Sequence, residues 1–473
     1  MIRNIQTDIC VIGGGSGGLS VAAGAAQMGA QVVLCEGGKM GGDCLNYGCV
    51  PSKALIEAAR IQHHINKAPQ FGVKAHGEVN FKAVHAHIHQ VIATIEPHDS
   101  VERFESLGVQ VINANARFIN AKTVEAGEYR ITAKYIVLAT GSRARILPLT
   151  GLSEIDYLTN ETIFDLTELP QYLVIVGAGP IGCELAQSYS LLGSQVTLLE
   201  AASEILGPAD SDCKAIVMDE FVKLGIDVMT NVKIQSFSQD NNDIKYIDYE
   251  HNGQQKRLQA SHVLMATGRM PNIEKLDLDK AGVVYSPHGV NVDKRLRTNH
   301  KHIYAIGDIA SPLQFTHMAG YHAGIVIQNM LFKLPAKVDH SSFPWVTYTT
   351  PEIAHTGLAI KKAEKQGAQI LQLSFADNDR AQASHATNGL IKVAVTSKGH
   401  ILGVSIVGES AGELITPWTI AIKNKLKVKH MASFIAPYPT LSELSKRTAG
   451  SFYTPKLYSA KTRQFVRLLL KWF

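Results

Sequence analysis

Two cysteines five residues apart, Cys44 and Cys49, are the most chemically distinctive feature of the sequence. In a regular helix, residues with this spacing have Cα atoms about 8.5 Å apart, which exceeds the roughly 7 Å limit for a disulfide. A bond between them would therefore require a non-helical turn, which Gly48 can provide. Pro51 suits the first turn of a following helix, and the positive end of that helix favours a thiolate at Cys49. The alternative is a pair of incidental buried cysteines.

A glycine-rich turn precedes the cysteines in the chain. It lies between an expected buried strand (8–12) and an Ala-rich helical stretch that reaches about residue 29, and a second strand (31–36) follows. In such a βαβ unit the first glycine makes the turn, the second lets the backbone approach a pyrophosphate, and the third allows helix and strand to pack closely. The helix N-terminus attracts phosphate, and an acid at the end of the second strand can hold ribose hydroxyls. The predicted dinucleotide-binding residues are Gly13, Gly15, Gly18 and Glu36.

The same pattern recurs over residues 172–200, with Gly177, Gly179, Gly182 and Glu200. Two alanines and a serine follow Glu200, so no cation is present to meet a 2′-phosphate, which the carboxylate would repel. This favours NADH over NADPH. Two dinucleotide sites in one chain suggest two cofactors that exchange a hydride.

The length of 473 residues indicates about three domains. Short alternating apolar runs at 109–138 suggest an antiparallel insertion, and the apolar stretch 262–265 is expected to close the second βαβ unit. From residue 341 onward, strands (391–395 and 401–407) mix with helices, which indicates a separate α+β domain.

Composition is that of an ordinary globular protein, with 45% hydrophobic and 18% charged residues. No run approaches the ~18 apolar residues of a membrane span, and the first residues lack the apolar core of a signal peptide; we therefore expect a cytoplasmic protein. The six cysteines are too few for a secreted disulfide framework. Residues 444–473 contain seven Lys or Arg and no acid, which leaves 39 basic and 41 acidic residues elsewhere and argues against a nucleic-acid surface.

The segment Gly41-Gly42-Asp43-Cys44-Leu45-Asn46-Tyr47-Gly48-Cys49-Val50-Pro51-Ser52-Lys53 resembles the redox-active motif of the class I pyridine nucleotide–disulfide oxidoreductases. This family includes dihydrolipoamide dehydrogenase, glutathione reductase and mercuric reductase. Further motifs extend the resemblance over essentially the whole chain. They are Ala139-Thr140-Gly141-Ser142, Ala266-Thr267-Gly268-Arg269, Ala305-Ile306-Gly307-Asp308, Phe343-Pro344 and Thr350-Pro351-Glu352-Ile353-Ala354.

The resemblance implies an α/β fold with two Rossmann-like dinucleotide-binding domains and a C-terminal α+β dimerisation domain. The expected FAD-binding domain covers residues 1–150 and 273–340, the inserted NAD-binding domain 151–272, and the dimerisation domain 341–473. The implied cofactors are FAD and NAD(H), and the implied assembly is a homodimer.

The resemblance also assigns roles to individual residues. It implies a Cys44–Cys49 redox disulfide, in which Cys49 is the thiolate against the flavin and Cys44 the thiol that attacks the acceptor. Lys53 would lie near the flavin and pair with Glu184, because a buried lysine needs a carboxylate to keep its charge. The remaining implied cofactor-binding residues are Gly42, Thr140, Gly141, Ser142, Asp308 and Gly268.

Three positions depart from the family pattern. Threonine is usual where this chain has Asp43, and an acid there is expected to raise the thiol pKa of Cys44. Dithiol-oxidising members have His-Pro-x-x-x-Glu where this chain has Tyr438-Pro439-Thr440-Leu441-Ser442-Glu443. Tyrosine titrates near 10 rather than ~6.5, so Tyr438 can donate a hydrogen bond but is a poor base. Mercuric reductases also have Tyr there, together with a C-terminal cysteine pair, but no cysteine follows Cys213 here.

Two further patterns are open to more than one interpretation. His85, His87 and His89 alternate; on a helix only His85 and His89 share a face, so we expect a solvated face and no metal site. In the tail, cations and apolar residues each recur every four residues, which predicts an amphipathic helix too short to span a bilayer. The recurring cations are Arg463, Arg467 and Lys471, and the recurring apolar residues are Phe465, Leu469 and Phe473. The apolar side is widened by Val466, Leu468, Leu470 and Trp472. This helix either lies in a membrane interface or packs on the dimer.

Together these patterns predict a homodimeric flavoenzyme that passes electrons from NADH through FAD to the cysteine pair and then to a small-molecule or protein disulfide. The alternatives are a transhydrogenase or oxidase, a mercuric reductase-like enzyme, and a membrane-associated redox sensor whose tail, 456–473, contacts the inner membrane face.

Overall fold

The computed structural model describes residues 2–472, which form two compact units. Unit 1 contains residues 2–177, 191–195 and 233–338, and unit 2 contains residues 178–190, 196–232 and 339–472. Phe473, expected on the apolar side of the tail, lies outside the described residues. The domain boundaries predicted from the sequence stay predictions, because compactness does not report which cofactor a segment binds.

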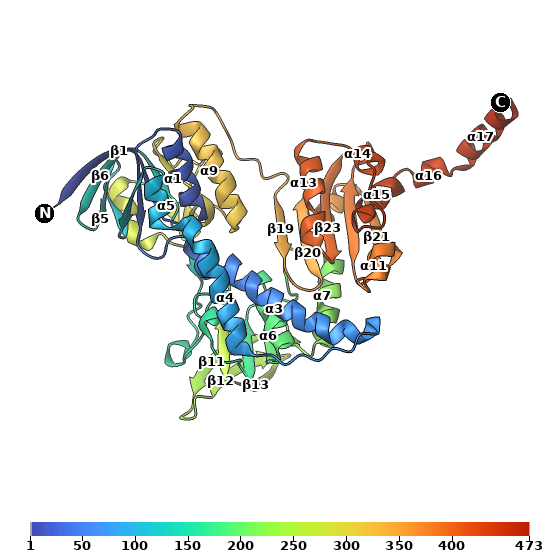
Figure 1. The fold of residues 1–473 in the computed structure, drawn as a ribbon, viewed down its shortest axis with the longest axis horizontal. Helices are drawn as coiled ribbons and strands as arrows, with labels where there is room; N and C mark the ends of the chain where they lie inside the picture. The colour runs from blue at the N-terminus through green and yellow to red at the C-terminus, as the bar shows by residue number, and fades with distance from the viewer. Residues whose placement is uncertain (1, 473) are drawn as a thin grey trace. The chain divides into compact units, whose positions relative to one another are not determined.

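The main sheet of unit 1 has the strand order β3-β2-β1-β6-β5-β4, and β18 pairs with the C-terminal end of β6. Neighbours from β3 to β6, and the β6–β18 pair, run parallel, whereas β6, β5 and β4 are antiparallel. Figure 1 shows α1 and α9 together beside this sheet. The bounds are β1 Arg3–Ile12, β2 Val32–Glu36, β3 Val109–Asn113, β4 Ala116–Asn120, β5 Thr123–Ala126, β6 Tyr129–Leu138, β18 Ile303–Ala305, α1 Ser16–Gln27 and α9 Thr316–Met330.

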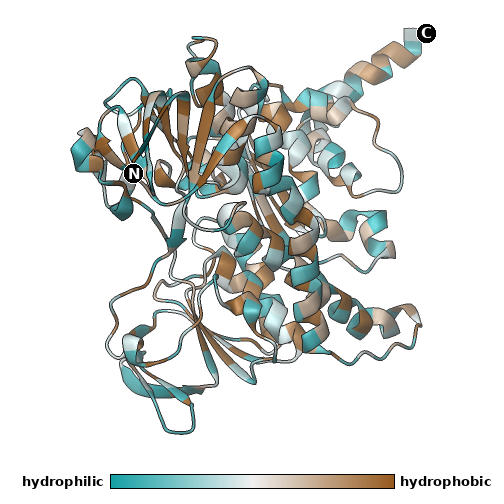
Figure 2. Cartoon of the chain, turned by 60° about the vertical axis from the view of Figure 1, so that its left-hand side comes forward, coloured by the Kyte–Doolittle hydropathy of each residue, from teal (hydrophilic) through white to brown (hydrophobic). Residues whose placement is uncertain are grey.

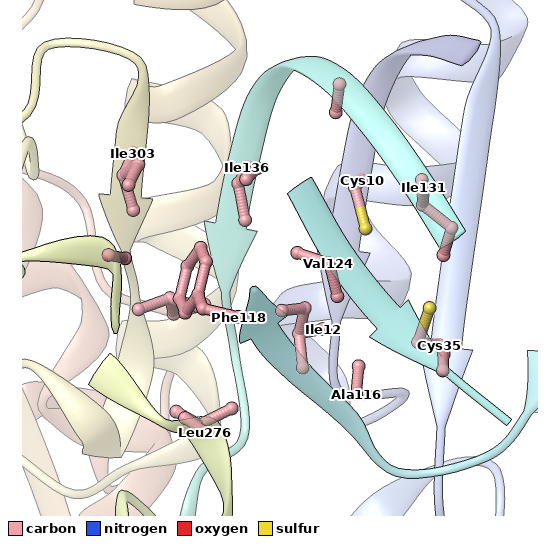
Figure 3. Packing of buried hydrophobic residues seen from close by; sticks show 14 of the residues in the cluster. Cys10, Ile12, Cys35, Ala116, Phe118, Val124, Ile131, Ile136, Leu276 and Ile303 are labelled. Atoms are coloured by element: carbon pink, nitrogen blue, oxygen red, sulfur yellow. The ribbon is translucent and has the colours of Figure 1, made fainter. Parts of the chain in front are cut away.

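The end of β1 is buried on both faces of this sheet, as its unbroken apolar run predicts for a central parallel strand. Ile9 and Val11 pack with the helices on one face. Cys10 and Ile12 pack on the other face with Cys35 (Figure 3). The interior strands are brown in the hydropathy colouring of Figure 2.

The sequence prediction for residues 109–138 was only partly right. Two of the four strands there, β4 and β5, form the antiparallel insertion, but β3 pairs in parallel with β2, and β6 pairs in parallel with β1 from its first residue to its last. The alternation of apolar residues identifies strands but not their partners, because both kinds of sheet can bury one face.

The rest of unit 1 contains a parallel pair, β8 and β14, and an antiparallel three-stranded sheet, β11-β12-β13, which the sequence did not predict. The expected strand at 262–265 is confirmed as β14. Bounds are β7 Ser142–Ala144, β8 Tyr172–Val176, β11 Lys233–Gln239, β12 Lys245–His251, β13 Gln254–Ala260, β14 His262–Met265, β15 Arg269–Pro271, β16 Tyr285–Ser286 and β17 Gly289–Val290. The helices are α2 Gly42–Asn46, α3 Cys49–Lys67, α4 Phe81–Ile95, α5 Val101–Ser106 and α8 Leu278–Ala281.

Unit 2 is built around an antiparallel five-stranded sheet of order β19-β20-β23-β22-β21, which confirms the predicted α+β character after residue 341. It also contains the parallel pair β9 and β10. Strand bounds are β9 Gln195–Leu199, β10 Asp227–Met229, β19 Pro344–Thr347, β20 Glu352–Gly357, β21 Gln369–Ser374, β22 Leu390–Val395 and β23 Ile401–Gly408. The helices are α6 Pro180–Leu192, α7 Ser211–Lys223, α10 Ile360–Lys365, α11 Asp379–Ala383, α12 Ala411–Leu414, α13 Thr416–Lys423, α14 Val428–Ser433, α15 Ser442–Ser451, α16 Thr454–Leu457 and α17 Ala460–Trp472.

Among residues 2–472, no helix is both long enough and apolar enough to cross a bilayer.

Candidate active site

The first glycine turn has the geometry that its sequence predicts. Gly13 has φ of 111°, and a Cβ there would lie 2.4 Å from the carbonyl oxygen of Ala139. A Cβ on Gly18 would lie 1.9 Å from the carbonyl oxygen of Gly13, so helix α1 can approach the strand only with glycine. The turn therefore brings backbone N–H groups and the start of α1 to one place, as a pyrophosphate requires.

Glu36 lies against this turn. Its carboxylate accepts hydrogen bonds from the backbone N–H groups of Gly14, at 2.5 Å, and Gly38, at 2.6 Å. The acid is thus fixed at the end of β2, where it can receive ribose hydroxyls.

The loops after β6 and β18 hold a second set of polar groups in unit 1. The Thr140 hydroxyl donates a hydrogen bond to the backbone carbonyl of Asn272, and the Asn272 side-chain amide donates one to the backbone carbonyl of Thr140. Gly141 has φ of 67°. The hydroxyl of Ser142 donates to Asp308 at 2.6 Å. Burial raises the pKa of Asp308, which the Ser142 bond and the charge of Arg269 oppose. A half-buried carboxylate held at the edge of a glycine cradle fits a polyhydroxyl chain such as that of FAD.

Cys44 and Cys49 lie on two successive helices in unit 1. Cys44 is in α2, the chain leaves helical geometry at Tyr47 and Gly48, and Cys49 is the first residue of α3. The predicted non-helical turn and the helix N-terminus at Cys49 are both confirmed. Both cysteines are thiols in the structure, so their disulfide stays a prediction.

Sulfur hydrogen bonds distinguish the two thiols. Hydrogen bonding from Cys44 and from Thr316, with the positive charge of Lys53, lowers the pKa of Cys49 to about 6, although burial and Asp43 oppose this. The Thr316 Oγ1 lies 3.3 Å from Cys49 Sγ. The same contact with Cys49, together with burial, raises the pKa of Cys44. Cys49 is therefore the thiolate and Cys44 the thiol at neutral pH, the charge states that their predicted roles require.

Three helix N-termini meet at the sulfur pair. Cys49 begins α3 and Thr316 begins α9, while the hydroxyl of Ser16, which begins α1, favours the thiolate form of Cys44. Each N-terminus presents partial positive charge, which favours a thiolate.

Asp43 is held by an ion pair and an amide. Its Oδ1 lies 3.1 Å from Arg269 Nη2 and accepts a 2.9 Å hydrogen bond from Asn160. The negative charge of Asp43 raises the pKa of Cys49. The expected influence of Asp43 on Cys44 stays a prediction, because the largest effects on the pKa of that thiol come from its contact with Cys49 and from burial.

Gly42 connects the sulfur segment to the nucleotide turn. It has φ of 59°, and a Cβ there would lie 2.7 Å from the Cα of Gly15. The structure therefore explains why glycine is needed at this predicted cofactor-binding position.

The second glycine turn repeats the geometry of the first. Gly177 has φ of 107°, and Gly268, in the loop after β14, has φ of 104°. Within unit 2, the Glu200 carboxylate accepts hydrogen bonds from the backbone N–H groups of Ala178, at 2.7 Å, and Ala202, at 2.8 Å. A Cβ on Gly179 would meet no atom within 4 Å, so there is open space over the turn. Gly182 lies in α6.

Lys53 belongs to unit 1 and Glu184 to unit 2, and their predicted ion pair stays a prediction. Lys53 is one turn into α3. Glu184 is buried in α6 and accepts a hydrogen bond from the backbone N–H of Tyr348 at 2.9 Å.

Tyr438 and Glu443 lie in unit 2. The Tyr438 hydroxyl donates to Asp379 at 2.9 Å, and this bond and the negative charges of Asp379 and Glu443 raise the pKa of Tyr438. Tyr438 therefore stays protonated at neutral pH even more fully than an ordinary tyrosine, so it is not available as a base.

His85 and His89 share a face of α4, with ring centroids 4.3 Å apart, and His89 Nε2 lies 3.6 Å from Asp165. Burial and the neighbouring His89 lower the pKa of His85. No group of three or more His, Cys, Asp or Glu within residues 2–472 has an arrangement that could hold a metal ion.

The sequence analysis missed Thr316, Ser16 and Asn160. Thr316 and Ser16 begin helices that follow recognised motifs, which is a signal that could have been used. Asn160 lies in irregular chain far from any motif, and only the fold brings it to Asp43.

Comparison with known proteins defines the class. The family "Pyridine nucleotide-disulphide oxidoreductase" matches residues 7–323, and its dimerisation domain matches residues 343–449. The chain belongs to this family: it is an FAD-dependent disulfide oxidoreductase that uses NAD(P)H and carries the family's dimerisation domain.

Individual relatives lie in several branches. A mercuric reductase of Staphylococcus aureus is 32% identical over 95% of this chain and 83% of its own length. A dihydrolipoyl dehydrogenase of Geobacillus stearothermophilus is 33% identical over 94% of this chain and 96% of its own. The Cu(II) complex of the HOCl-induced flavoprotein disulfide reductase RclA from Escherichia coli superposes with a TM-score of 0.85 at 26% identity, covering 94% of this chain and 99% of RclA.

Proposed function

We propose that this enzyme uses NADH to reduce a small-molecule or protein disulfide through Cys44 and Cys49. When bound, FAD supplies a two-electron carrier between nicotinamide and the sulfur pair. The observation that supports these sulfur roles is the opposite shift of the two pKa values, down for Cys49 and up for Cys44, at a junction of three helix N-termini. The cofactor-binding roles proposed for the first turn, for Lys53 and for Glu184 follow the family pattern.

The proposed exchange uses both sulfurs in turn. Cys44 Sγ attacks one sulfur of the acceptor disulfide and forms a mixed disulfide, and the proton from Cys44 goes to the first departing thiolate. The Cys49 thiolate then attacks Cys44 Sγ, which forms the Cys44–Cys49 disulfide and releases the second thiolate, protonated by water. The acceptor gains two electrons and two protons, and the cysteine pair loses two electrons.

Removal of the Cys44 proton is the difficult part of this exchange. Cys44 remains protonated at neutral pH, and Tyr438, whose pKa is raised by Asp379, cannot take the proton. A positioned base is worth about 10²–10⁴ in rate. We therefore expect slow turnover with dihydrolipoamide or lipoamide, and faster turnover with acceptors whose departing thiolate is acidic.

The proposed preference for NADH rests on Glu200, whose carboxylate is held at the second turn by Ala178 and Ala202. A 2′-phosphate placed there would meet this negative charge.

Four alternatives use the same cofactors. The relatives named mercuric reductase and the Cu(II) complex of RclA point to metal ions as acceptors, but the sequence after Cys213 contains no cysteine that would support this route. In a transhydrogenase, an oxidase or a redox sensor, the cysteine pair would not be oxidised and reduced in every catalytic cycle.

Variants of the two cysteines test the proposal. FAD-loaded protein with NADH and oxidised lipoamide or glutathione should turn over steadily, and Cys44→Ser and Cys49→Ser should each lower this rate by about 10³-fold or more. Reduction of ferricyanide, which can take electrons from flavin directly, serves as the control and should persist in both variants. Disulfide reduction that survives in Cys44→Ser would contradict the proposal, and one stoichiometric reduction without turnover would indicate a sensor.

Absorbance separates the roles of the two sulfurs. A long-wavelength band from the Cys49 thiolate beside oxidised flavin should appear in the two-electron-reduced enzyme and in Cys44→Ser, and should be absent from Cys49→Ser. A band that persists in Cys49→Ser would reverse the assignment.

Substitution of Tyr438 by histidine tests the missing base. Tyr438→His should raise lipoamide turnover by about tenfold or more, part of the 10²–10⁴ range for general base catalysis, and should leave flavin reduction by NADH unchanged. Tyr438→Phe removes the hydroxyl without adding a base and should show no gain. Equal rates in the two variants would mean that the acceptor site lacks more than a base.

We also propose a cytoplasmic location, with peripheral contact between the tail, residues 456–473, and a membrane.

A further inference from the structure

The C-terminal helix α17 is an exposed apolar feature that electron transfer does not use. None of its residues is buried. Phe465 is 59% exposed, Leu470 76% and Trp472 78%. In Figure 1 the chain leaves the sheet of unit 2 at α15, and α16 and α17 continue away from it; Figure 2 shows brown residues at the surface of this end.

The sequence starts this helix at a defined residue. Ser459 Oγ accepts a hydrogen bond from the backbone N–H of Thr462 at 3.2 Å, which is the N-cap arrangement. Helices of about 12–15 residues are nevertheless marginal in water when no packing supports them. Because α17 has 13 residues and buries none, its stability as a helix depends on a surface that covers its apolar side.

The side chains of α17 divide into two faces. At 100° per residue, Arg463, Arg467, Lys471 and Gln464 fall within one narrow arc. The opposite, wider arc contains Phe465, Val466, Leu468, Leu469, Leu470 and Trp472, and of the cations only Lys461, in the first turn, lies on that side. An aromatic-rich apolar face bordered by cations is the pattern of a helix lying in a membrane interface.

The positive charge of the tail favours a lipid surface over the tail of a second copy of this chain as the partner that covers α17. Residues 444–473 contain seven cations and no acid, so two tails repel each other. The match to the dimerisation domain ends at residue 449, before α17 begins. A surface rich in anionic headgroups would complement the cations and accept the apolar face at the same time.

We propose that α17 binds the surface of membranes rich in anionic phospholipid and lies parallel to that surface. The helix is about 20 Å long, well short of the roughly 30 Å hydrocarbon core, so it does not cross. A dimer presents two such helices, and their combined binding exceeds that of one.

Vesicle sedimentation of the FAD-loaded enzyme tests this proposal. The protein should pellet with vesicles of equimolar phosphatidylcholine and phosphatidylglycerol, and not with phosphatidylcholine alone. Raising the ionic strength to about 1 M, where the Debye length is about 3 Å, should release most of it. The triple variant Arg463→Glu, Arg467→Glu, Lys471→Glu should bind about 100-fold or more weakly, since each cation near an anionic surface contributes about fivefold.

A matched variant controls for net charge. Lys361→Glu, Lys362→Glu, Lys365→Glu makes the same change on exposed residues of α10 and should bind like the natural protein. Phe465→Ser with Leu469→Ser keeps the charge and should also lose binding. The fluorescence of Trp472 should shift to shorter wavelength on vesicles, and Trp472→Phe should remove that shift.

Three outcomes would overturn the proposal. They are equal pelleting of the natural protein and the α17 charge variant, equal binding to neutral and anionic vesicles, and absence of binding at low salt. A weaker dimer in Phe465→Ser with Leu469→Ser, without any vesicle binding, would assign α17 to the subunit interface. Disulfide reduction by NADH in solution, measured on the same samples, is independent of lipid and keeps this test separate from that of the proposed function.

Discussion

The turns at Gly13 and Gly177 have nearly the same backbone and different neighbours. Their φ angles are 111° and 107°, and a Cβ on either would lie 2.4 Å from a carbonyl oxygen, of Ala139 and Ala266 respectively. Each turn also has an acid, Glu36 or Glu200, that accepts a backbone N–H from within the turn.

The two turns differ in the segment that donates a hydrogen bond to the backbone carbonyl of the residue after the first glycine. The carbonyl of Gly14 accepts the N–H of Gly41 at 2.9 Å, which fixes the segment that leads to Cys44. The equivalent carbonyl, of Ala178, accepts the N–H of Leu206 at 2.8 Å, from a loop without redox groups. The same turn geometry is thus joined to the cysteine segment in one case and to a loop without cysteine in the other.

Alanine at the first glycine of each turn should produce the largest effects and separate the two cofactors. Gly13→Ala should yield protein that has lost most of its flavin absorbance. Gly177→Ala should keep flavin but reduce it with NADH about 100-fold more slowly, the scale expected for a misplacement of roughly 1 Å. Gly320→Ala, in α9 with no atom within 4 Å of its Cβ, is the control. Loss of flavin in both turn variants would show that the turns are not independent.

A smaller effect is expected from the acid of the second turn. The natural enzyme should have kcat/KM for NADH about 100-fold above that for NADPH, since like charges brought together cost several kcal/mol. Glu200→Gln should reduce this ratio, whereas Glu36→Gln should weaken flavin retention without changing it. A ratio near one in the natural enzyme would refute the role of Glu200.

The smallest effect concerns the segment bonded to the first turn. Asp43 places negative charge near Cys49 and so disfavours its thiolate. Asp43→Asn should therefore lower the pKa of Cys49 further below about 6, and the long-wavelength band of the reduced enzyme should persist to lower pH. Glu57→Gln removes an exposed acid further along α3 and should leave the titration unchanged. An unchanged or higher value in Asp43→Asn would contradict the assignment.

Local sequence predicted the parts of the fold that depend on local geometry. The strand–turn–helix units, the break at Gly48 and the helix start at Cys49 follow from glycine spacing and helix-end preferences. The C-terminal end of β1 and the bounds of β2 lie close to those expected, whereas β1 begins at Arg3 instead of residue 8.

Features that depend on the tertiary fold could not be predicted from local sequence. The parallel pairing of β3 with β2, the sheet β11-β12-β13, and the approach of Thr316 and Asn160 to the sulfur segment join residues far apart in sequence. The effect of Asp43 on the pKa of Cys49 was not predicted either, because charge acts through space rather than along the chain.

The burial of the cysteines has a consequence for chemical probes. All six fall within the described residues: Cys10, Cys35, Cys183 and Cys213 are buried, Cys44 is half-buried, and Cys49 alone is exposed. Cys49 is also the cysteine with the lowered pKa. A soft electrophile such as a maleimide or a chloroacetamide should therefore modify Cys49 first in reduced protein that has been freed of flavin, and bound flavin, which Cys49 is expected to face, should protect it. The rate of labelling at this one cysteine would thus report how much of the protein holds its flavin.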